Sequence, residues 1–276
     1  MESGSMDDRV IASIKQTLAA VEADEDVRIL LAVESGSRAW GFPSSDSDYD
    51  VRFVYVRRPN LYLSIDLEEQ RDVIERPLRD NIDLSGWDIR KALRLFRKSN
   101  PPLLEWLQCP TVYLERFSLA VRLRDLLPAF YSPRASFFHY LHMARGNIRE
   151  YLHGDVVWRK KYFYVLRPLL AMRWIDQGLG PVPIEFARLV EATVSDDAVR
   201  TAIDALLSAK RSGAELDRGP RISSISDFIH QEMARFEQTA SDRFSPVPPI
   251  EALNQVFRAA LEEAWHDERD LPMART

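Results

Sequence analysis

Hydrophobic and polar positions recur with two different periods over the first hundred residues. Residues 7–22 carry apolar side chains at the spacing of one helix face, which predicts an amphipathic helix. Residues 27–33 (VRILLAV) form a short apolar run rich in β-branched side chains, typical of a buried strand. Residues 48–56 predict a second strand, and 70–78 and 81–87 predict two more. The first third of the chain therefore predicts a sheet flanked by helices.

Helical periodicity dominates from about residue 99 onward, and no strand is expected there. The predicted helices cover residues 115–127, 134–153, 158–177, 183–193, 196–212, 223–239 and 249–266. The whole pattern predicts an α+β protein. A small mixed-sheet domain would span residues 1–110, and a mostly α-helical domain would span residues 111–276.

Composition narrows the classes of protein to which this chain can belong. Its 276 residues are 46% hydrophobic and 29% charged, the profile of a globular protein. No apolar run approaches the roughly 20 residues of a membrane span, and the first residues lack the basic and apolar segments of a secretory signal. The single cysteine excludes an internal disulfide, and the net charge of −5 argues against a uniformly basic surface for nucleic acid. We therefore expect a cytoplasmic protein with no membrane partner.

The stretch GSRAWGFPSSDSDYDV contains the residues best suited to chemistry. It begins with a Gly36-Ser37 turn after the predicted strand 27–33, and this turn would present backbone N–H groups and a hydroxyl to an anion. It ends on the next strand, where Asp48 and Asp50 project to one face because side chains alternate along a strand. Four residues of this strand would face the core instead, namely Tyr49, Val51, Phe53 and Tyr55.

Two neighbouring carboxylates repel each other unless a cation lies between them. Oxygen ligands suit Mg²⁺, which typically binds one or two carboxylates plus substrate phosphates. A third carboxylate would orient or deprotonate the attacking hydroxyl, and Asp83 is preferred because a neighbouring strand could bring it beside Asp48 and Asp50. Asp88 is the alternative, although its place at the start of the helix IRKALRLFRK also gives it a capping role.

These segments resemble a known superfamily. GSRAWGFPSSDSDYDV resembles the signature of the DNA-polymerase-β nucleotidyltransferase superfamily, with Gly-Ser, a spacer and Asp-x-Asp on a strand. IDLSGWD resembles the strand that carries the superfamily's third acid, which again selects Asp83. The chain is also similar to the predicted nucleotidyltransferase branch that includes RNA-repair, RNA-ligase-associated polymerases, through GSRAWGF, SDYDVRFVYV, GWDIRKALRLFRKSNPPLLEWL and KKYFYVLRPLLA. These segments extend from about residue 33 to residue 171, and the rest of the chain carries no such motif.

The resemblance implies a polymerase-β-like palm domain and a metal-dependent transfer of a nucleoside monophosphate from an NTP to an acceptor hydroxyl, with pyrophosphate release. Asp48, Asp50 and Asp83 would bind Mg²⁺ or Mn²⁺, and Gly36 and Ser37 would bind the β- and γ-phosphates. The acceptor it suggests is an RNA end. Alternatives are a protein acceptor, as in toxin–antitoxin systems that attach nucleotides to a partner, and a non-catalytic nucleotide- or RNA-binding sensor.

Other basic residues would complete the triphosphate site. Arg38 either contacts the triphosphate or is a structural arginine. In the helix RKKYFYVLRPLLA, Lys160 and Arg167 share one face by their spacing. This basic face would close over the triphosphate and stabilise the charge that passes to pyrophosphate.

Two histidines one helical turn apart, His139 and His142, form a further cluster. They lack a third metal ligand at a suitable spacing, which favours a structural or substrate-contact role. Arg145 and Arg149 continue the same helix face and could contact a phosphate backbone.

Overall fold

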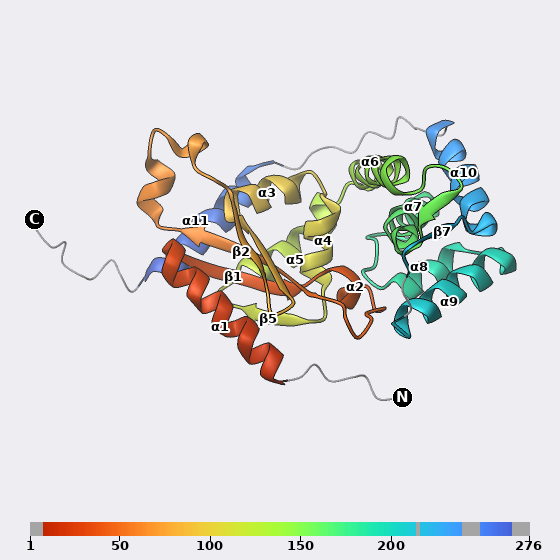
Figure 1. Ribbon diagram of the computed structural model, residues 1–276. Helices are drawn as coiled ribbons and strands as arrows, with labels where there is room; N and C mark the ends of the chain where they lie inside the picture. The colour runs from red at the N-terminus through yellow and green to blue at the C-terminus, as the bar shows by residue number, and fades with distance from the viewer. Residues whose placement is uncertain (1–7, 214–215, 239–248, 267–276) are drawn as a thin grey trace, which may run out of the picture.

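The protein is described by a computed structural model that covers residues 8–213, 216–238 and 249–266. Two groups of elements lie side by side in Figure 1: a five-stranded sheet with its flanking helices, and a second group of helices around α7 (Tyr162–Asp176). The architecture is therefore mixed α+β, as the sequence periodicity predicts. No helix within the described ranges is long and apolar enough to cross a membrane.

The sheet brings two of the predicted acids to the same level of adjacent strands. Its order is β3-β4-β2-β1-β5. Its strands are β1 (Val27–Glu34), β2 (Tyr49–Arg57), β3 (Val73–Arg79), β4 (Ile82–Asp88) and β5 (Val112–Glu115). β2 and β4 run parallel, whereas the other neighbouring pairs are antiparallel. The β2–β4 register pairs Asp50 with Asp83.

The remaining elements fall into two sets. The elements nearest the sheet are α1 (Asp8–Glu25), α2 (Gly36–Ala39), η1 (Pro59–Leu63), η2 (Leu67–Glu69), α3 (Ile89–Arg97), α4 (Pro101–Gln108), α5 (Leu119–Phe130) and α11 (Glu251–Trp265). The second set comprises α6 (Pro133–Tyr151), β6 (Val156–Trp158), η3 (Arg159–Lys161), α7, α8 (Phe186–Thr193), α9 (Asp197–Arg211), β7 (Arg218–Pro220) and α10 (Ser223–Gln238).

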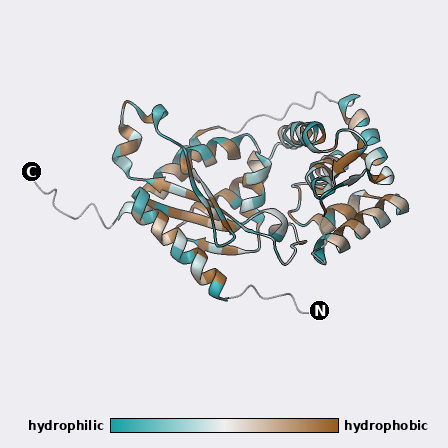
Figure 2. Ribbon diagram, viewed as in Figure 1, coloured by the Kyte–Doolittle hydropathy of each residue, from teal (hydrophilic) through white to brown (hydrophobic). Residues whose placement is uncertain are grey.

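The two faces of β2 are buried in different cores. Val51, Phe53 and Tyr55 pack with α1 on one face, as the alternation along the strand predicts. Val54 and Val56 pack on the other face with α3, α4, α5 and α11. Figure 2 shows hydrophobic residues on the strands and on the inward sides of these helices. Because side chains alternate, Asp50 and Arg52 belong to the second face.

A third core joins α6–α10 around α7, which is buried on nearly every side. Phe42, from the loop between α2 and β2, belongs to this cluster and stacks on Phe163 with the ring centroids 4.7 Å apart. The backbone N–H of Phe186 also donates to the Trp40 carbonyl over 3.0 Å. The loop that leads to the acidic strand is therefore fixed to the second group of elements.

The four strands expected before residue 99 are confirmed by β1–β4. The expectation that no strand follows residue 99 is wrong, because β5, β6 and β7 lie beyond it. Each of these strands has only three or four residues, too few to show a two-residue period. The domain division at residues 110/111 stays a prediction; β5, α5 and α11 contact the sheet, whereas α6–α10 form the third core.

Gly86 offers a test of the packing between β2 and β4. A Cβ atom at Gly86 would overlap the ring of Phe53, whereas a Cβ atom at Gly146, inside α6, would meet nothing within 4 Å. We expect Gly86→Ala to lower the free energy of unfolding by about 1–3 kcal/mol, the usual cost of overpacking a core. Gly146→Ala should raise it by about 0.5–1 kcal/mol, because alanine loses less backbone entropy in a helix. Urea denaturation of both variants measures the difference; equal stability would contradict the described packing.

Candidate active site

The turn after β1 places backbone directly against an acidic side chain. Gly36 begins α2 with φ = +59°, a conformation that residues with a side chain rarely adopt. A Cβ atom at this position would overlap the Asp50 carboxylate and lie only 2.8 Å from its Cγ. Gly36 is therefore required both by its backbone angle and by the closeness of Asp50.

A network of hydroxyl groups shapes the loop between α2 and β2. The Oγ atom of Ser47 accepts a hydrogen bond from the Ser44 backbone N–H over 3.0 Å, and it lies 2.9 Å from the Ser44 Oγ. Ser37, predicted to bind phosphate, donates its hydroxyl to the same Ser47 Oγ over 3.3 Å. The Ser37 hydroxyl thus lies within the loop that connects Gly36 to the acidic strand.

Arg38 holds the backbone that leads to the first aspartate. Its Nε donates to the carbonyl of Asp48 over 3.1 Å, and its Nη2 donates to the carbonyl of Ser47 over 2.7 Å. Its guanidinium carbon also lies 3.9 Å from the centroid of the Tyr49 ring. These contacts support the structural interpretation of Arg38, with the charge remaining beside the acids.

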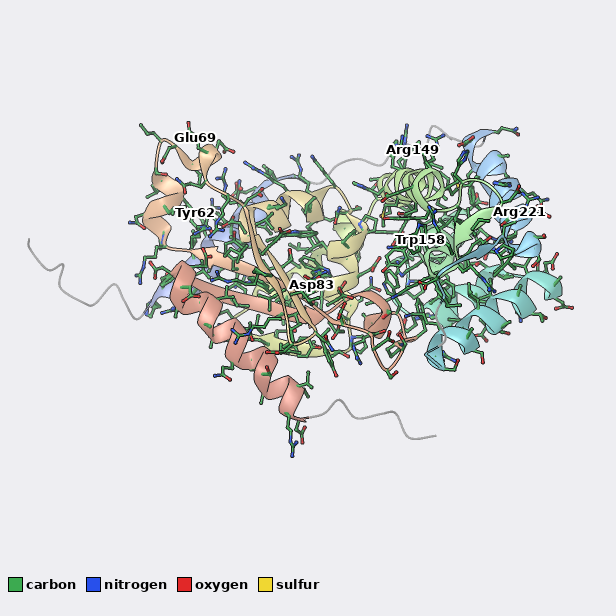
Figure 3. All side chains as sticks on the ribbon, in the orientation of Figure 1. Tyr62, Glu69, Asp83, Arg149, Trp158 and Arg221 are labelled. Atoms are coloured by element: carbon green, nitrogen blue, oxygen red, sulfur yellow. The ribbon has the colours of Figure 1, made fainter. Side chains whose placement is uncertain are left out.

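Asp50 and Asp83 share one positive partner. Arg52 Nη2 lies 3.1 Å from Asp50 Oδ1 and 2.7 Å from Asp83 Oδ2, so one guanidinium bridges two adjacent strands. Figure 3 places Asp83 near the centre of the molecule, close to the junction between the two groups of elements. Asp48 is exposed and immediately precedes β2. The structure therefore brings Asp50 and Asp83 together and places Asp48 beside them on the chain.

The charge on Asp50 is unfavourable in this setting. Burial raises the pKa of Asp50 above its ordinary value, and the negative charges of Asp83 and Asp48 raise it further. Arg52 opposes this shift but does not cancel it. Burial and two neighbouring negative charges therefore make the ionised form of Asp50 less favourable than it is in water.

Asp88, the alternative to Asp83 as third acid, caps a helix instead. Its carboxylate accepts hydrogen bonds from the Arg90 backbone N–H over 2.8 Å and from the Tyr62 hydroxyl over 2.7 Å. It lies at the end of β4 away from Asp83, is 5% exposed, and caps the first turn of α3. Of the two alternatives, Asp83 alone pairs with Asp50 across the sheet.

The carboxylates offer donors that suit a divalent cation. Mg²⁺ prefers oxygen ligands, and a bound cation would stabilise the ionised form of the partly buried Asp50. Within the described residues, no three His, Cys, Asp or Glu side chains are already gathered as a metal site. Since Mg²⁺ typically takes one or two protein carboxylates and completes its shell with water and substrate phosphates, Asp48, Asp50 and Asp83 fit a metal that arrives with a triphosphate. The metal site stays a prediction.

Glu34 is a buried acid that the sequence patterns did not single out. Its Oε1 accepts from the backbone N–H of Asp50 over 2.8 Å and from that of Ser35 over 3.2 Å, and its other oxygen accepts from the Tyr113 hydroxyl. Burial raises the pKa of Glu34. This carboxylate fixes the backbone on both sides of the contact between Gly36 and Asp50. In the sequence, the only sign of this role was that Glu34 directly follows the apolar run 27–33.

Lys210 is a second residue that sequence reasoning missed. It comes from the last turn of α9, and its Nζ donates to the Ser44 Oγ over 3.3 Å. Burial lowers the pKa of Lys210, and the positive charges of Lys160 and Arg38 lower it further. These charges act on the loop between α2 and β2, to which Arg211 also donates at the Gly41 carbonyl over 3.4 Å. Lys160, which was predicted, is exposed at this position.

The prediction that Arg167 shares an open basic face with Lys160 is wrong. Arg167 is 2% exposed. Its Nη1 pairs with Glu105 Oε1 over 2.7 Å, and its guanidinium carbon lies 4.9 Å from the Trp40 ring centroid. Lys160 lies in η3, before α7 begins, and α7 is buried on nearly every side, so the face that carries Arg167 packs against α4 and the turn after α2.

Comparisons with known proteins cover nearly the whole chain. A sequence profile of the RNA repair pathway DNA polymerase beta family matches residues 10–259. The chain is 46% identical over 263 residues to the uncharacterized protein YcgL of Bacillus subtilis (strain 168), covering 95% of this chain and 99% of that protein. A solved structure of a nucleotidyltransferase-like protein from Exiguobacterium sibiricum 255-15 is similar with a TM-score of 0.33 and 13% identity, over 95% and 96% of the two chains. This last likeness is too distant to carry an argument.

The overlap between Gly36 and Asp50 can be tested by stability alone. Gly36→Ala and Gly41→Ala both place a side chain at positive φ, but a Cβ atom at Gly41 meets nothing within 4 Å. We expect Gly36→Ala to cost more stability than Gly41→Ala. In an Asp50→Ala background the excess should shrink by about 0.5–3 kcal/mol, the range for residues in contact. A double-mutant cycle in urea measures this coupling, and a value of zero would refute the contact.

The raised pKa of Asp50 predicts how stability depends on pH. Because the folded protein holds the proton more tightly than the unfolded chain, the charged side chain destabilises the fold at neutral pH. Asp50→Asn should therefore be more stable than the parent at pH 7. Its advantage should fade as the pH falls through the raised pKa of Asp50 and below the ordinary value of 3.8.

Urea midpoints at pH 7 and near pH 4 measure this difference. Asp80→Asn, at an aspartate whose side chain is 80% exposed, is the control and should change little at either pH. An Asp50→Asn variant less stable than the parent at pH 7 would show that Arg52 outweighs burial and repulsion.

Proposed function

The chain belongs to the RNA repair pathway DNA polymerase beta family, and we propose that it transfers a nucleoside monophosphate from an NTP to an acceptor hydroxyl. Membership of this family supports nucleotidyl transfer as the general type of reaction. The observation that carries the specific proposal is the packing of the Gly36 turn against Asp50, with Asp83 paired across the sheet and Asp48 next along the chain. An anion-binding turn beside clustered acids suits a reaction on a polyanionic substrate.

The reaction forms a bond between the acceptor oxygen and the α-phosphorus and breaks the bond to pyrophosphate. Asp83, next to Asp50 and held by Arg52, would orient the acceptor hydroxyl and take its proton. Asp48 and Asp50 would hold Mg²⁺ or Mn²⁺ with the triphosphate. A bound divalent cation supplies positive charge to the reacting and leaving oxygens. The raised pKa of Asp50 is consistent with this assignment, because a bound cation would stabilise a carboxylate whose charge burial makes unfavourable.

The triphosphate would lie against the loop between α2 and β2. Gly36 and Ser37 lie in α2, which leads into this loop, and Lys160 and Lys210 add positive charge from the helical group. Such charge stabilises a pyrophosphate leaving group. Lys210 would replace the role first considered for Arg167, whose guanidinium is buried against Glu105.

For the acceptor, we propose an RNA end, following the pathway in the family's description. A protein acceptor and a non-catalytic sensor are the rivals. The sensor is the weaker of them, because a pure binder gains nothing from clustered acids that repel a bound triphosphate.

The test is pyrophosphate release from each ribonucleoside triphosphate, with Mg²⁺ or Mn²⁺ and total cellular RNA. We expect Asp48→Ala/Asp50→Ala to lower the rate at least about 100-fold, the scale for losing a group that stabilises transition-state charge. The matched control is Asp204→Ala/Asp227→Ala, which removes two exposed aspartates from helix surfaces and should leave the rate unchanged. Label from an α-labelled NTP should appear on RNA.

The alternative outcomes are distinct. Label on a protein band would move the acceptor to a polypeptide. Bound NTP without any pyrophosphate release, under every condition, would support the sensor and contradict the proposal.

A further inference from the structure

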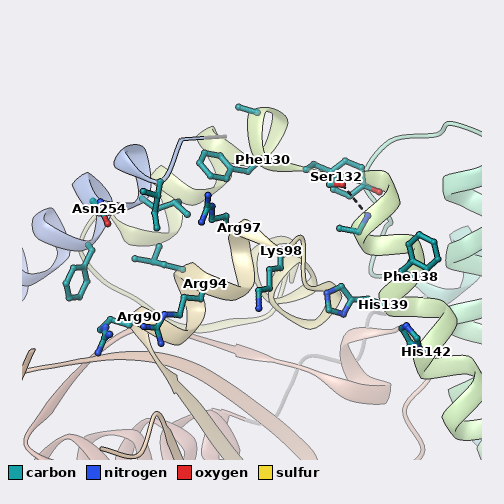
Figure 4. Close-up of a pocket in the computed structure, with 17 residues that line it drawn as sticks. Arg90, Arg94, Arg97, Lys98, Phe130, Ser132, Phe138, His139, His142 and Asn254 are labelled. Carbon is teal, nitrogen blue, oxygen red and sulfur yellow. Dashed lines mark hydrogen bonds between the residues drawn. The ribbon is translucent and has the colours of Figure 1, made fainter. Parts of the chain in front are cut away.

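A second concave surface, the groove, lies apart from the acidic strands, between α3, α6 and α11. It is a cavity of about 990 Å³ (Figure 4). None of its 17 lining residues is acidic, although the chain carries a net charge of −5. Positive side chains have therefore been concentrated on this surface, which is the electrostatic signature of a site for a polyanion.

One wall of the cavity is a row of basic side chains on α3. Arg90, Arg94 and Arg97 recur at helical spacing along one face, and Lys98 follows at the end of the helix. Glu68 pairs with Arg90 over 2.8 Å and approaches Arg94 at 3.6 Å. Arg97 and Lys98 are exposed and have no acidic partner among the described residues. Their charges are therefore available to a ligand.

The other wall adds histidines and aromatic rings. His139 and His142 extend from α6 toward the Lys98 end of the row (Figure 4). Burial lowers the pKa of His139, and the positive charges of His142 and Lys98 lower it further. Phe138 lines the same wall as a half-buried ring. Cations beside an aromatic ring are the components with which proteins bind single-stranded nucleic acid.

The cavity lies on the same side of the sheet as the acids. α3 packs on the face of β2 that carries Val54 and Val56, and Asp50 and Arg52 alternate onto this same face. α3 also follows directly from β4, the strand of Asp83. A nucleic-acid strand bound over α3 would therefore lie on the side of the sheet where the acceptor hydroxyl must arrive.

We propose that this groove binds the acceptor as single-stranded RNA, with phosphates on Arg97 and Lys98, further contacts from His139 and His142, and a base against Phe138. The role of the RNA as acceptor rests on the proposed function, whereas the binding of RNA to the groove does not. The single-stranded form is favoured because Phe138 offers a ring to an unpaired base, which a duplex would not present.

The experiment measures binding of a fluorescent single-stranded RNA by anisotropy, in the absence of NTP and over a range of salt concentrations. Arg97→Ala/Lys98→Ala should raise the Kd about tenfold. It should also reduce the slope of log K against log salt by about 1.4, since each phosphate contact on a single strand contributes about 0.7. Phe138→Ala should weaken binding with little change in the salt slope, because stacking is not ionic.

The matched control is Lys15→Ala/Arg79→Ala, which also removes one lysine and one arginine. Lys15 lies on α1, which covers the opposite face of the sheet, and Arg79 ends β3 with its side chain 90% exposed. This control should leave the Kd and the slope unchanged. Thermal unfolding of each variant confirms that the fold is retained.

Equal Kd values for the groove variant and the parent would overturn the proposal, as would equal weakening by the control. Displacement of the RNA by poly-glutamate at matched charge would also overturn it, in favour of an acidic protein ligand. Groove-dependent RNA binding in a protein that releases no pyrophosphate would sustain the groove and contradict the nucleotidyl-transfer proposal, so the two can fail separately.

Discussion

The contact between the Gly36 backbone and the Asp50 carboxylate depends on a buried acid beneath it. Glu34 accepts hydrogen bonds from the backbone N–H groups of Ser35 and Asp50, and the Ser35 N–H also donates to the Asp50 carbonyl over 2.8 Å. These bonds set the spacing between the end of β1 and the start of β2. Because Gly36 has no side chain, its turn can approach the Asp50 carboxylate at this spacing. The glycine and the buried acid therefore together allow the turn after β1 to lie against the Asp50 carboxylate.

The balance of charge follows from that contact. Asp50 is partly buried between Asp83 and Asp48, and Arg52 compensates only in part. Positive charge is found instead across the loop, where Lys160 and Lys210 come from the helical group. Acidic side chains therefore gather at the start of β2, while Lys210 contacts the preceding loop at Ser44. The magnesium-bound triphosphate that we propose as substrate would have the complementary distribution, with its cation against the acids and its phosphates against the lysines.

The sequence predicted those features of the fold and site that depend on residues close together in the chain. The apolar run 27–33, the alternation through Val51 and Phe53, and the cap at Asp88 are local patterns, and the structure confirms them. Contacts between distant residues could not be read in this way. Lys210 reaches Ser44 across 166 residues, and Arg167 is buried against Glu105, 62 residues away, and against Trp40. The short strand β5 follows the same rule, since its place in the sheet depends on β1 rather than on its own period.

The arrangement of α3 shows how one helix can serve both the core and the surface. Its apolar residues, among them Ile89, Leu93 and Phe96, pack under the face of the sheet that carries Asp50. The arginines between them have to face outward because of the helical period. The packing that fixes α3 on the acidic strands therefore also fixes its basic row at a set position relative to them. Any nucleic acid that binds along α3 is therefore held by a helix packed on the strands of Asp50 and Asp83. A fixed geometry of this kind is required to bring an acceptor end to a reacting phosphate.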